Sequence, residues 1–357
     1  MSRCFAVLCA VALMVAGCGR APEELPVPTS QDLCKGAVGD GPKVGMAYDV
    51  GGRNDRGIND AAFAGLSEAV DELKATCVEG EAAEGEQEAA RIDRLQQFAD
   101  NGANVIVAVG TSYVRAVDKV SQSYPRIQFA LVDAITGKRT LGRNVAVLRF
   151  NPEQAGFLAG AAAALKSATG VVGFVGAPAA QGLEPADPYQ AGFQAGVTAA
   201  KPTVQVVATR LERDTPAPGK PDSATKVTKA QFEDSDVDVV FGSPGVSERA
   251  LFNAARAEGD GTWVVGIGSD QFQAATEDQK PHILTSVIKR YDTVTFDFLK
   301  SVADRKPVTG RHVYGLDDGA LGFVTSGKFL TRKQVTKLSA LRHQVESGAI
   351  QVPNRLG

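Results

Sequence analysis

The segment KVGMAYDVGGRNDRGIND, residues 43–60, joins a short apolar run to a glycine-containing turn and then to the start of a helical pattern. Residues 44–50 have the composition of a buried strand, and residues 61–76 have the apolar spacing of a helix. A strand followed by a turn and a helix is the repeating unit of α/β folds. The same alternation continues along the rest of the chain.

Several of the apolar runs are continuous in Val, Ile and Phe, which is typical of strands buried on both faces of a parallel sheet. The expected strands are residues 44–50, 105–110, 127–133, 144–150, 171–177, 204–211, 237–242, 262–270 and 283–289. The expected helices are residues 61–76, 86–101, 114–124, 152–166, 189–200, 223–232, 248–258, 291–304 and 331–347. Asn151-Pro152 and Thr331 offer the chemistry of helix starts.

These strands are too many for one doubly wound sheet of the usual size, so the sequence predicts two α/β lobes. The polar, glycine-containing loop between Asp133 and Asn144 is the expected first crossing between them. The first lobe is then expected to comprise residues 42–140 plus about 271–312. The second is expected to comprise about 141–270 plus 313–350, with a ligand cleft between the lobes.

The N-terminus has the pattern of an exported lipoprotein. Residues 1–17 carry one Arg, an apolar run and Val-Ala-Gly directly before Cys18, which predicts a cleaved signal peptide. The run is shorter than the ~20 residues that span a bilayer. Cys18 is expected to carry the lipid that holds the protein at the cell membrane, and residues 18–41 are expected to be a flexible tether. The alternative is a plain signal peptide in which Cys18 is incidental.

Cys34 and Cys77 are the two cysteines that remain after Cys4, Cys9 and Cys18 are assigned to the leader and the lipid site. Exported proteins usually pair their cysteines, so a Cys34–Cys77 disulfide is expected. Two free thiols are the alternative.

The composition and motifs argue against several function classes. The 357 residues are 44% hydrophobic and 22% charged, enough for ordinary cores, and the formal net charge of −3 argues against a nucleic-acid surface. His282, His312 and His343 are far apart and in no metal-ligand spacing. Residues 322–329 resemble a P-loop, but Phe329 replaces its Ser or Thr. We therefore expect that the protein is not an enzyme, has no catalytic residues and binds neither a metal nor a cofactor.

Polar residues recur where the expected strands end. Asp49, Asp133 and Asp270 each close a strand, and Lys289 closes the last one. Ligands of open α/β sheets bind beyond the carboxyl ends of the strands. Carboxylates with a cation can bind the hydroxyl groups of a small polar ligand there, although each acid alone could equally be a helix cap or loop residue.

The sequence resembles the basic membrane protein (PnrA-like) family of substrate-binding lipoproteins of ABC importers. The resemblance covers nearly the whole mature chain and is carried by KVGMAYDVGGRNDRGIND, GANVIVAVG, YPRIQFALVDA, the segment from NVAVLRF to VVGFVGA, YQAGFQAGV, WVVGIGSDQ and ILTSVIKRYD. It implies a type I periplasmic-binding-protein fold and a purine nucleoside ligand. By position, it implies ligand contacts from Asp49, Asn59, Asp133, Gly245, Asp270 and Lys289. Gly245, Asp270 and Lys289 would face a ribose, and Asp133 the base.

The chain departs from this family pattern where the ligand would bind. Ile58 occupies the position of an aromatic residue that stacks on the purine, and a second aromatic expected near residues 219–222 is missing. The loop 245–249, GVSER, has bulkier and charged residues in place of glycines. Stacking is worth about 1 to 3 kcal/mol per base in nucleic-acid binding proteins. Affinity for purines is then weak, or one of three tyrosines substitutes: Tyr48, Tyr113 or Tyr189. For Tyr189, packing of its helix is the competing interpretation.

The sequence thus predicts a lipid-anchored, monomeric binding protein on the extracytoplasmic face of the membrane, which passes a nucleoside-like ligand to an ABC permease. One alternative ligand is a sugar-like or other non-aromatic polyol. A different alternative is a surface sensor or adhesin built on the same fold.

Overall fold

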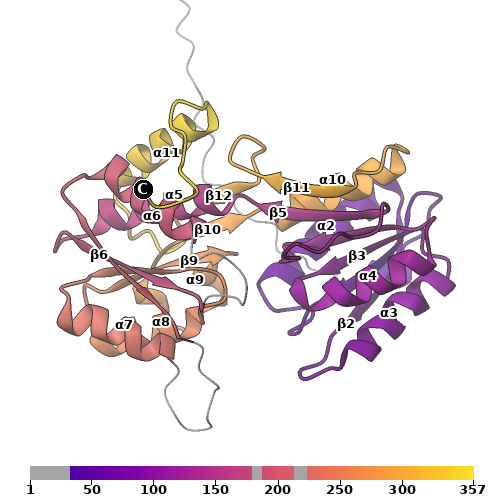
Figure 1. The fold of residues 1–357 in the computed structure, drawn as a ribbon, viewed down its shortest axis with the longest axis horizontal. Helices are drawn as coiled ribbons and strands as arrows, with labels where there is room; N and C mark the ends of the chain where they lie inside the picture. Colours follow the sequence, from indigo (N-terminus) through magenta and orange to yellow (C-terminus); the bar gives the residue numbers. More distant parts are fainter. Residues whose placement is uncertain (1–32, 179–186, 213–222) are drawn as a thin grey trace, which may run out of the picture.

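The framework of the molecule is two six-stranded sheets, shown side by side in Figure 1. The computed structural model describes residues 33–178, 187–212 and 223–357. The expected signal peptide, Cys18, most of the expected tether and residues 219–222 lie outside this part of the chain. No helix among the described residues is both long enough and apolar enough to cross a bilayer.

The first sheet has the strand order β2-β1-β3-β4-β5-β11, and all of its neighbouring strands are parallel. Its strands are β1 (Lys43–Tyr48), β2 (Thr76–Glu81), β3 (Val105–Val109), β4 (Gln128–Val132), β5 (Val145–Phe150) and β11 (Gly310–Tyr314). Helices cover both faces: α2 (Ile58–Leu73) packs with α10 (Tyr291–Ala303), and α3 (Glu88–Asp100) packs with α4 (Val114–Ser123).

The second sheet repeats this topology in the order β7-β6-β8-β9-β10-β12, and only β12 runs antiparallel. Its strands are β6 (Val171–Gly176), β7 (Gln205–Arg210), β8 (Val239–Gly242), β9 (Trp263–Gly268), β10 (Ile283–Lys289) and β12 (Leu321–Phe323). Its main helices are α5 (Pro152–Lys166), α6 (Pro188–Ala200), α7 (Ser223–Asp234), α8 (Glu248–Glu258) and α11 (Arg332–Glu346). Short helical turns are α1 (Leu33–Gly36), η1 (Thr111–Tyr113), α9 (Gln271–Ala274) and η2 (Lys280–His282).

Two α/β lobes are therefore present, as the sequence predicts, but the strands are divided between them differently. The expected crossing between Asp133 and Asn144 is wrong, because β5 pairs with β4 in the first sheet. The assignment of 283–289 to the first lobe is also wrong, because β10 pairs with β9 and β12. A polar loop resembles a domain boundary in the sequence, whereas here it only turns the chain back into the same sheet.

The chain crosses between the lobes three times, after β5, after β10 and after β11, and these crossings are hydrogen-bonded to one another. Asn151 N–H donates to the Tyr314 carbonyl (2.8 Å), and Arg290 N–H donates to the Ala320 carbonyl (2.8 Å). A set of adjacent connections between two separate sheets is the arrangement of a hinge.

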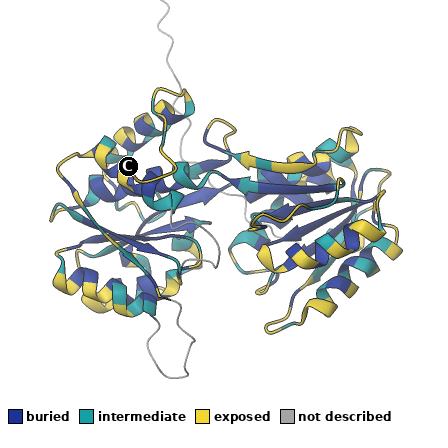
Figure 2. Cartoon of the chain, in the orientation of Figure 1, coloured by how far each residue is buried: buried dark blue, intermediate teal, exposed yellow. Residues whose placement is uncertain are grey.

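The core follows the sheets: Figure 2 shows the strands mostly buried and the outer helix faces exposed. One cluster of buried apolar residues contains members of both lobes, and two further clusters lie within single lobes. Helices α5 and α6 approach closely through glycines. A Cβ on Gly160 would lie 2.0 Å from the Phe193 carbonyl oxygen, and one on Gly196 would lie 2.0 Å from that of Phe157. The repeated AGF-x-AG pattern of these helices thus sets their packing distance.

All nine expected strands and nine expected helices are present. Asn151 and Thr331 accept hydrogen bonds from Gln154 N–H and Gln334 N–H, as expected of N-caps. The strands β2 and β11 were not expected. Both lie at an edge of the first sheet and are polar and partly exposed, so they lack the apolar signal of a central strand.

Candidate functional site

The strand order of the first lobe reverses between β1 and β3, the point where ligands of doubly wound sheets bind. Asp49 directly follows β1, and its Oδ1 accepts hydrogen bonds from Val50 N–H (2.8 Å) and Ser112 Oγ–H (2.6 Å). Gly110 follows β3 with φ = 86°, and a Cβ there would lie 2.1 Å from Asp49 Oδ2. The two strand ends therefore fix the Asp49 carboxylate at the sheet edge.

Asn59 holds Asp49 from behind. Its Oδ1 accepts a hydrogen bond from Asp49 N–H (3.0 Å), and its Nδ2 donates to the Asp49 carbonyl (3.3 Å). The side chain has 0% of its surface exposed. In this conformation Asn59 is a positioning residue. Ile58, at the first position of α2, is half-buried and packs against the core.

The loop between β1 and α2 is built by two further carboxylates. Asp55 accepts hydrogen bonds from Gly57 N–H, Asn59 N–H and Asp60 N–H at 2.7 to 3.1 Å, which caps α2. Asp60 accepts from Asn54 N–H (2.8 Å) and Arg56 N–H (2.9 Å). The loop also reaches the second lobe, because Arg56 Nη1 donates to the Gln273 carbonyl (2.7 Å).

Asp133 and Lys289 form an ion pair between the lobes. Lys289 Nζ, at the end of β10, lies 2.7 Å from Asp133 Oδ2, which also accepts the Tyr291 hydroxyl (3.0 Å). Asp133 has φ = 52°, in the left-handed region, as residues at functional sites often do. Lys289 is 4% exposed. Burial lowers its pKa, but the Asp133 carboxylate outweighs burial and holds the pKa well above its ordinary value.

Asp270 and Gly245 occupy strand ends of the second lobe. Asp270 Oδ1 caps α9 by accepting Phe272 N–H (3.2 Å), and its Oδ2 accepts the Ser326 hydroxyl. Burial raises the pKa of Asp270. Gly245 lies exposed in the loop after β8 with φ = 97°, where a Cβ would approach that of Ala177 to 3.3 Å. This loop adjoins the strand reversal between β6 and β8.

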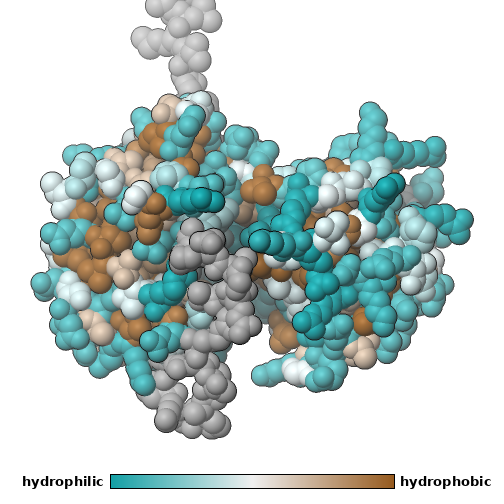
Figure 3. All heavy atoms as spheres, viewed as in Figure 1, coloured by the Kyte–Doolittle hydropathy of each residue, from teal (hydrophilic) through white to brown (hydrophobic). Residues whose placement is uncertain are grey.

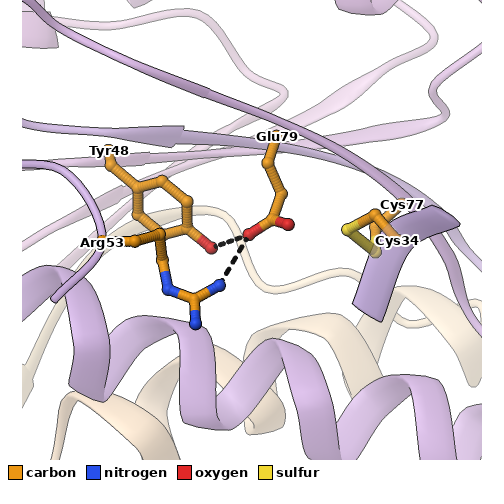
Figure 4. The surroundings of a disulfide bond; sticks show 5 residues. All are labelled: Cys34, Tyr48, Arg53, Cys77 and Glu79. Carbon is orange, nitrogen blue, oxygen red and sulfur yellow. Dashed lines mark hydrogen bonds and ion pairs between the residues drawn. A yellow bond between two sulfur atoms is a disulfide. The ribbon is translucent and has the colours of Figure 1, made fainter. Parts of the chain in front are cut away.

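Of the three tyrosines that could replace a stacking residue, two are buried in the first lobe. Tyr48 is 1% and Tyr113 0% exposed. Figure 4 shows the Tyr48 hydroxyl and the Arg53 guanidinium both directed at the Glu79 carboxylate, near the disulfide. Tyr189 is half-buried, and its ring centroid lies 5.9 Å from Lys289 Nζ. Tyr189 is thus the one of the three beside the inter-lobe ion pair.

Glu248 is a residue that the sequence did not single out. It begins α8, and its Oε1 accepts a hydrogen bond from Ile267 N–H of β9 (2.8 Å). Burial raises the pKa of Glu248 to about 7, while the Ile267 N–H and the charge of Lys289 oppose this rise. Its signal in the sequence was the charged residue in place of a glycine after Gly245.

Cavities of the first lobe include two lined by polar and charged side chains of the described residues. One, of about 370 Å³, includes Tyr48, Arg53, Glu79 and Glu81 in its lining. The other, of about 510 Å³, lies beside η1 and includes Thr111, Ser112 and three arginines, Arg91, Arg115 and Arg139. Figure 3 shows hydrophilic residues over much of the visible face of this lobe. No group of three or more His, Cys, Asp or Glu within residues 33–178, 187–212 and 223–357 could hold a metal ion.

Cys34 and Cys77 are bonded to each other in the structure, the pairing that the sequence predicts. The bond ties α1 to β2 at the edge of the first sheet (Figure 4). It therefore fixes the beginning of the described chain to the first lobe.

Known structures share this fold. A solute-binding protein of an ABC transporter from Conexibacter woesei is 20% identical, with a TM-score of 0.68, covering 87% of this chain and 99% of its own. One from Aeropyrum pernix is 24% identical, with a TM-score of 0.64, covering 87% of this chain and 94% of its own.

Sequence relatives extend over most of the chain. The "CD4+ T-cell-stimulating antigen" of Listeria innocua is 29% identical over 87% of this chain and 88% of the relative. The "Basic membrane protein A1" of Borrelia garinii is 24% identical over the same shares. The family model described as "ABC transporter substrate-binding protein PnrA-like" matches residues 42–355. The chain belongs to this family of ABC transporter substrate-binding proteins.

Proposed function

We propose that this chain binds a purine nucleoside between its two lobes and passes it to an ABC permease. Proteins of its family bind small-molecule ligands outside the cytoplasm. The observation that carries the proposal is the inter-lobe pair of Asp133 and Lys289. Asp270 follows β9, the strand next to β10, and Glu248 accepts a hydrogen bond from Ile267 N–H of β9. These side chains offer the acceptors and the ammonium donor that sugar hydroxyls need.

Ligand binding would bring the lobes together about the three crossings. A ligand that contacts both lobes stabilises the shut form only to the extent that it binds that form more tightly. Because Asp133 and Lys289 already meet across the lobes, we propose that the ligand exchanges partners with this pair. Asp49, Gly245 and Asp270 are the other proposed contacts, and Asn59 contributes by holding Asp49.

A sugar-like polyol is the second candidate ligand, favoured by one observation. Ile58 gives no ring for stacking on a base. Of the three tyrosines considered, Tyr189 alone is half-buried beside Lys289, so one ring at most could replace the two stacking residues. A ligand without an aromatic base would need neither. A surface sensor or adhesin on the same fold is a third candidate, and a histidine kinase encoded beside the gene in place of a permease would favour it.

The rest of the proposal concerns the setting of the protein. We propose that Cys18 carries lipid, that the protein is a monomer at the extracytoplasmic face of the cell membrane, and that it performs no catalysis. Mass spectrometry of the membrane-bound protein tests the lipid directly. An acyl mass on the peptide that begins at Cys18 is expected, and an unmodified cysteine there would contradict the anchor.

The ligand class can be tested by thermal unfolding of the chain from Ser30 onward, which keeps every described residue. The panel comprises nucleosides, free bases, pentoses and polyols. A ligand at a hundred times its dissociation constant adds about 2.7 kcal/mol of stability. Stabilisation by nucleosides is expected. Stabilisation by pentoses or polyols alone would contradict the nucleoside and favour the second candidate.

Variants assign the site. We expect Asp270→Ala and Lys289→Ala each to abolish or greatly weaken binding of the stabilising nucleoside while the protein remains folded. Binding would be measured by calorimetry and folding by circular dichroism. Full affinity in both variants would contradict the proposed contacts.

A further inference from the structure

Glu248 joins the strand ends of the second lobe that the proposed ligand would meet. The strands β8, β9 and β10 are neighbours, and the loop after β8 leads directly to Glu248. Ser247 caps α8 by accepting Ala250 N–H, which fixes where the helix begins. The Glu248 carboxylate then reaches Ile267 N–H of β9. It thus lies near the carboxyl ends of these strands, where Asp270 and Lys289 also lie.

Asp270 and Glu248 differ in how many of their carboxylate oxygens accept a hydrogen bond. Both oxygens of Asp270 accept hydrogen bonds, from Phe272 N–H and from Ser326. Glu248 Oε1 accepts the Ile267 N–H, but Oε2 has no hydrogen-bond partner within the described parts of the chain. The Glu248 residue is only partly exposed. Oε2 is not one of the fully buried unpaired atoms, so it keeps contact with solvent and can accept a hydrogen bond from a ligand that displaces that solvent.

The charge near Glu248 defines which donor fits. Lys289 is the one charged group, among the described residues, whose charge shifts the pKa of Glu248. Its ammonium is already paired with Asp133. The Glu248 carboxylate itself would repel a ligand phosphate, whereas a hydroxyl can donate to Glu248 and accept from Lys289.

We propose that Glu248 contacts the ligand directly, that its Oε2 accepts a hydrogen bond from a sugar-type hydroxyl next to Lys289, and that it thereby favours an unphosphorylated ligand over a phosphorylated one. This inference rests on the proposed nucleoside function. It adds a contact at a position where the family resemblance implied a glycine-rich loop.

The first test is the pH dependence of inosine binding by the wild-type chain, measured by calorimetry. Because Oε1 accepts the Ile267 N–H, the proton of the neutral carboxyl lies on Oε2 and makes it a donor, which does not match a donating ligand hydroxyl. With a pKa of about 7, roughly a tenth of Glu248 is ionised at pH 6. We expect inosine to bind about tenfold more tightly at pH 8.5 than at pH 6.

The second test uses Glu248→Gln, which keeps the shape and an acceptor for Ile267 N–H, with Glu258→Gln as matched control. Glu258 is exposed at the other end of the same helix. At pH 8.5 we expect Glu248→Gln to weaken inosine binding about tenfold, to remove most of its pH dependence and to narrow the preference for inosine over inosine 5′-monophosphate. Glu258→Gln should match the wild type. Replacing inosine by 2′,3′-dideoxyinosine should weaken binding to the wild type more than it weakens binding to Glu248→Gln.

The outcomes separate the two proposals. If the wild type binds inosine and Glu248→Gln has the affinity, pH dependence and phosphate preference of Glu258→Gln, the Glu248 contact is overturned and the nucleoside function stands. If the wild type does not bind inosine at millimolar concentration at either pH, the nucleoside function fails and this inference fails with it. Circular dichroism of both variants checks that loss of binding is not loss of fold.

Discussion

The acidic residues after β1 in the first lobe accept hydrogen bonds mainly from their own loop, whereas Glu248 in the second lobe accepts one from a neighbouring strand, β9, and lies near a cation. Asp55 alone accepts three backbone N–H groups. Glu248 accepts one, and burial raises its pKa to about 7. The first arrangement stabilises a loop. The second leaves Glu248 Oε2 without a hydrogen-bond partner among the described residues, although both residue types follow a strand in the sequence.

The largest effect is expected at the ion pair that joins the two lobes. Lys289→Met should lower the free energy of unfolding by about 3 to 5 kcal/mol, because it leaves the half-buried Asp133 carboxylate without its cation. Urea unfolding measures this change. Adding Asp133→Asn to the variant should restore part of the stability. A single variant as stable as the wild type would show that the pair does not hold the lobes in this arrangement.

The next largest loss of stability is expected from removing the disulfide, which lies in the first lobe alone. Cys34→Ser with Cys77→Ser should lower stability by about 2 to 4 kcal/mol, since the bond closes a loop with a sequence separation of 43. The bond is confined to the first lobe, so nucleoside affinity should be retained. Thermal unfolding with and without a reducing agent gives the same comparison in the wild type. An unchanged midpoint in both experiments would contradict the expected stabilisation.

The first-lobe loop gives a smaller effect. Asp55→Ala removes the acceptor of three N–H groups at the start of α2 and should lower stability by about 1 to 3 kcal/mol. Asp55→Asn, which keeps an acceptor oxygen, is the control and should lose less. Equal losses from both substitutions would mean that the charge of Asp55, and not its hydrogen bonds, stabilises the loop.

The second-lobe carboxylate gives the smallest effect, with the opposite sign. Burial raises the pKa of folded Glu248 from its ordinary 4.5 to about 7, so the folded state binds the proton more tightly than the unfolded state. Its contribution to stability is therefore fully present below about pH 4.5 and is lost as pH rises to about 7. Between pH 5 and pH 8, the free energy of unfolding of the wild type should therefore fall by about 1 to 2 kcal/mol more than that of Glu248→Gln. Parallel pH profiles of the two proteins would contradict this.

Much of the fold was predictable from the sequence, because central strands such as Val105–Val109 are continuously apolar and fully buried. The polar edge strands β2 and β11 were not, since they bury little. The division into lobes was partly wrong, because hydrophobic patterning identifies a strand but not its partner in a sheet. β5 and β10 were assigned to the wrong sheets for this reason.

The candidate site was predictable only at the level of strand ends. Asp133 and Lys289 were both singled out, but their contact across 156 residues depends on where the lobes cross. Asn59 was expected to contact the ligand, and in the structure Oδ1 and one hydrogen of Nδ2 pair with the main chain of Asp49. Glu248 was noticed only as a departure from glycine. Its importance comes from burial and from Lys289, which no local pattern encodes.

Above all, we propose that the two lobes together bind one hydroxyl-bearing nucleoside. Calorimetric titration of the chain from Ser30 onward with inosine at pH 8.5 tests it most directly, with free ribose and hypoxanthine as separate titrants. We expect one inosine to bind per chain, and ribose or hypoxanthine alone to bind much more weakly. Equal binding of ribose and inosine, or no heat from inosine, would contradict it.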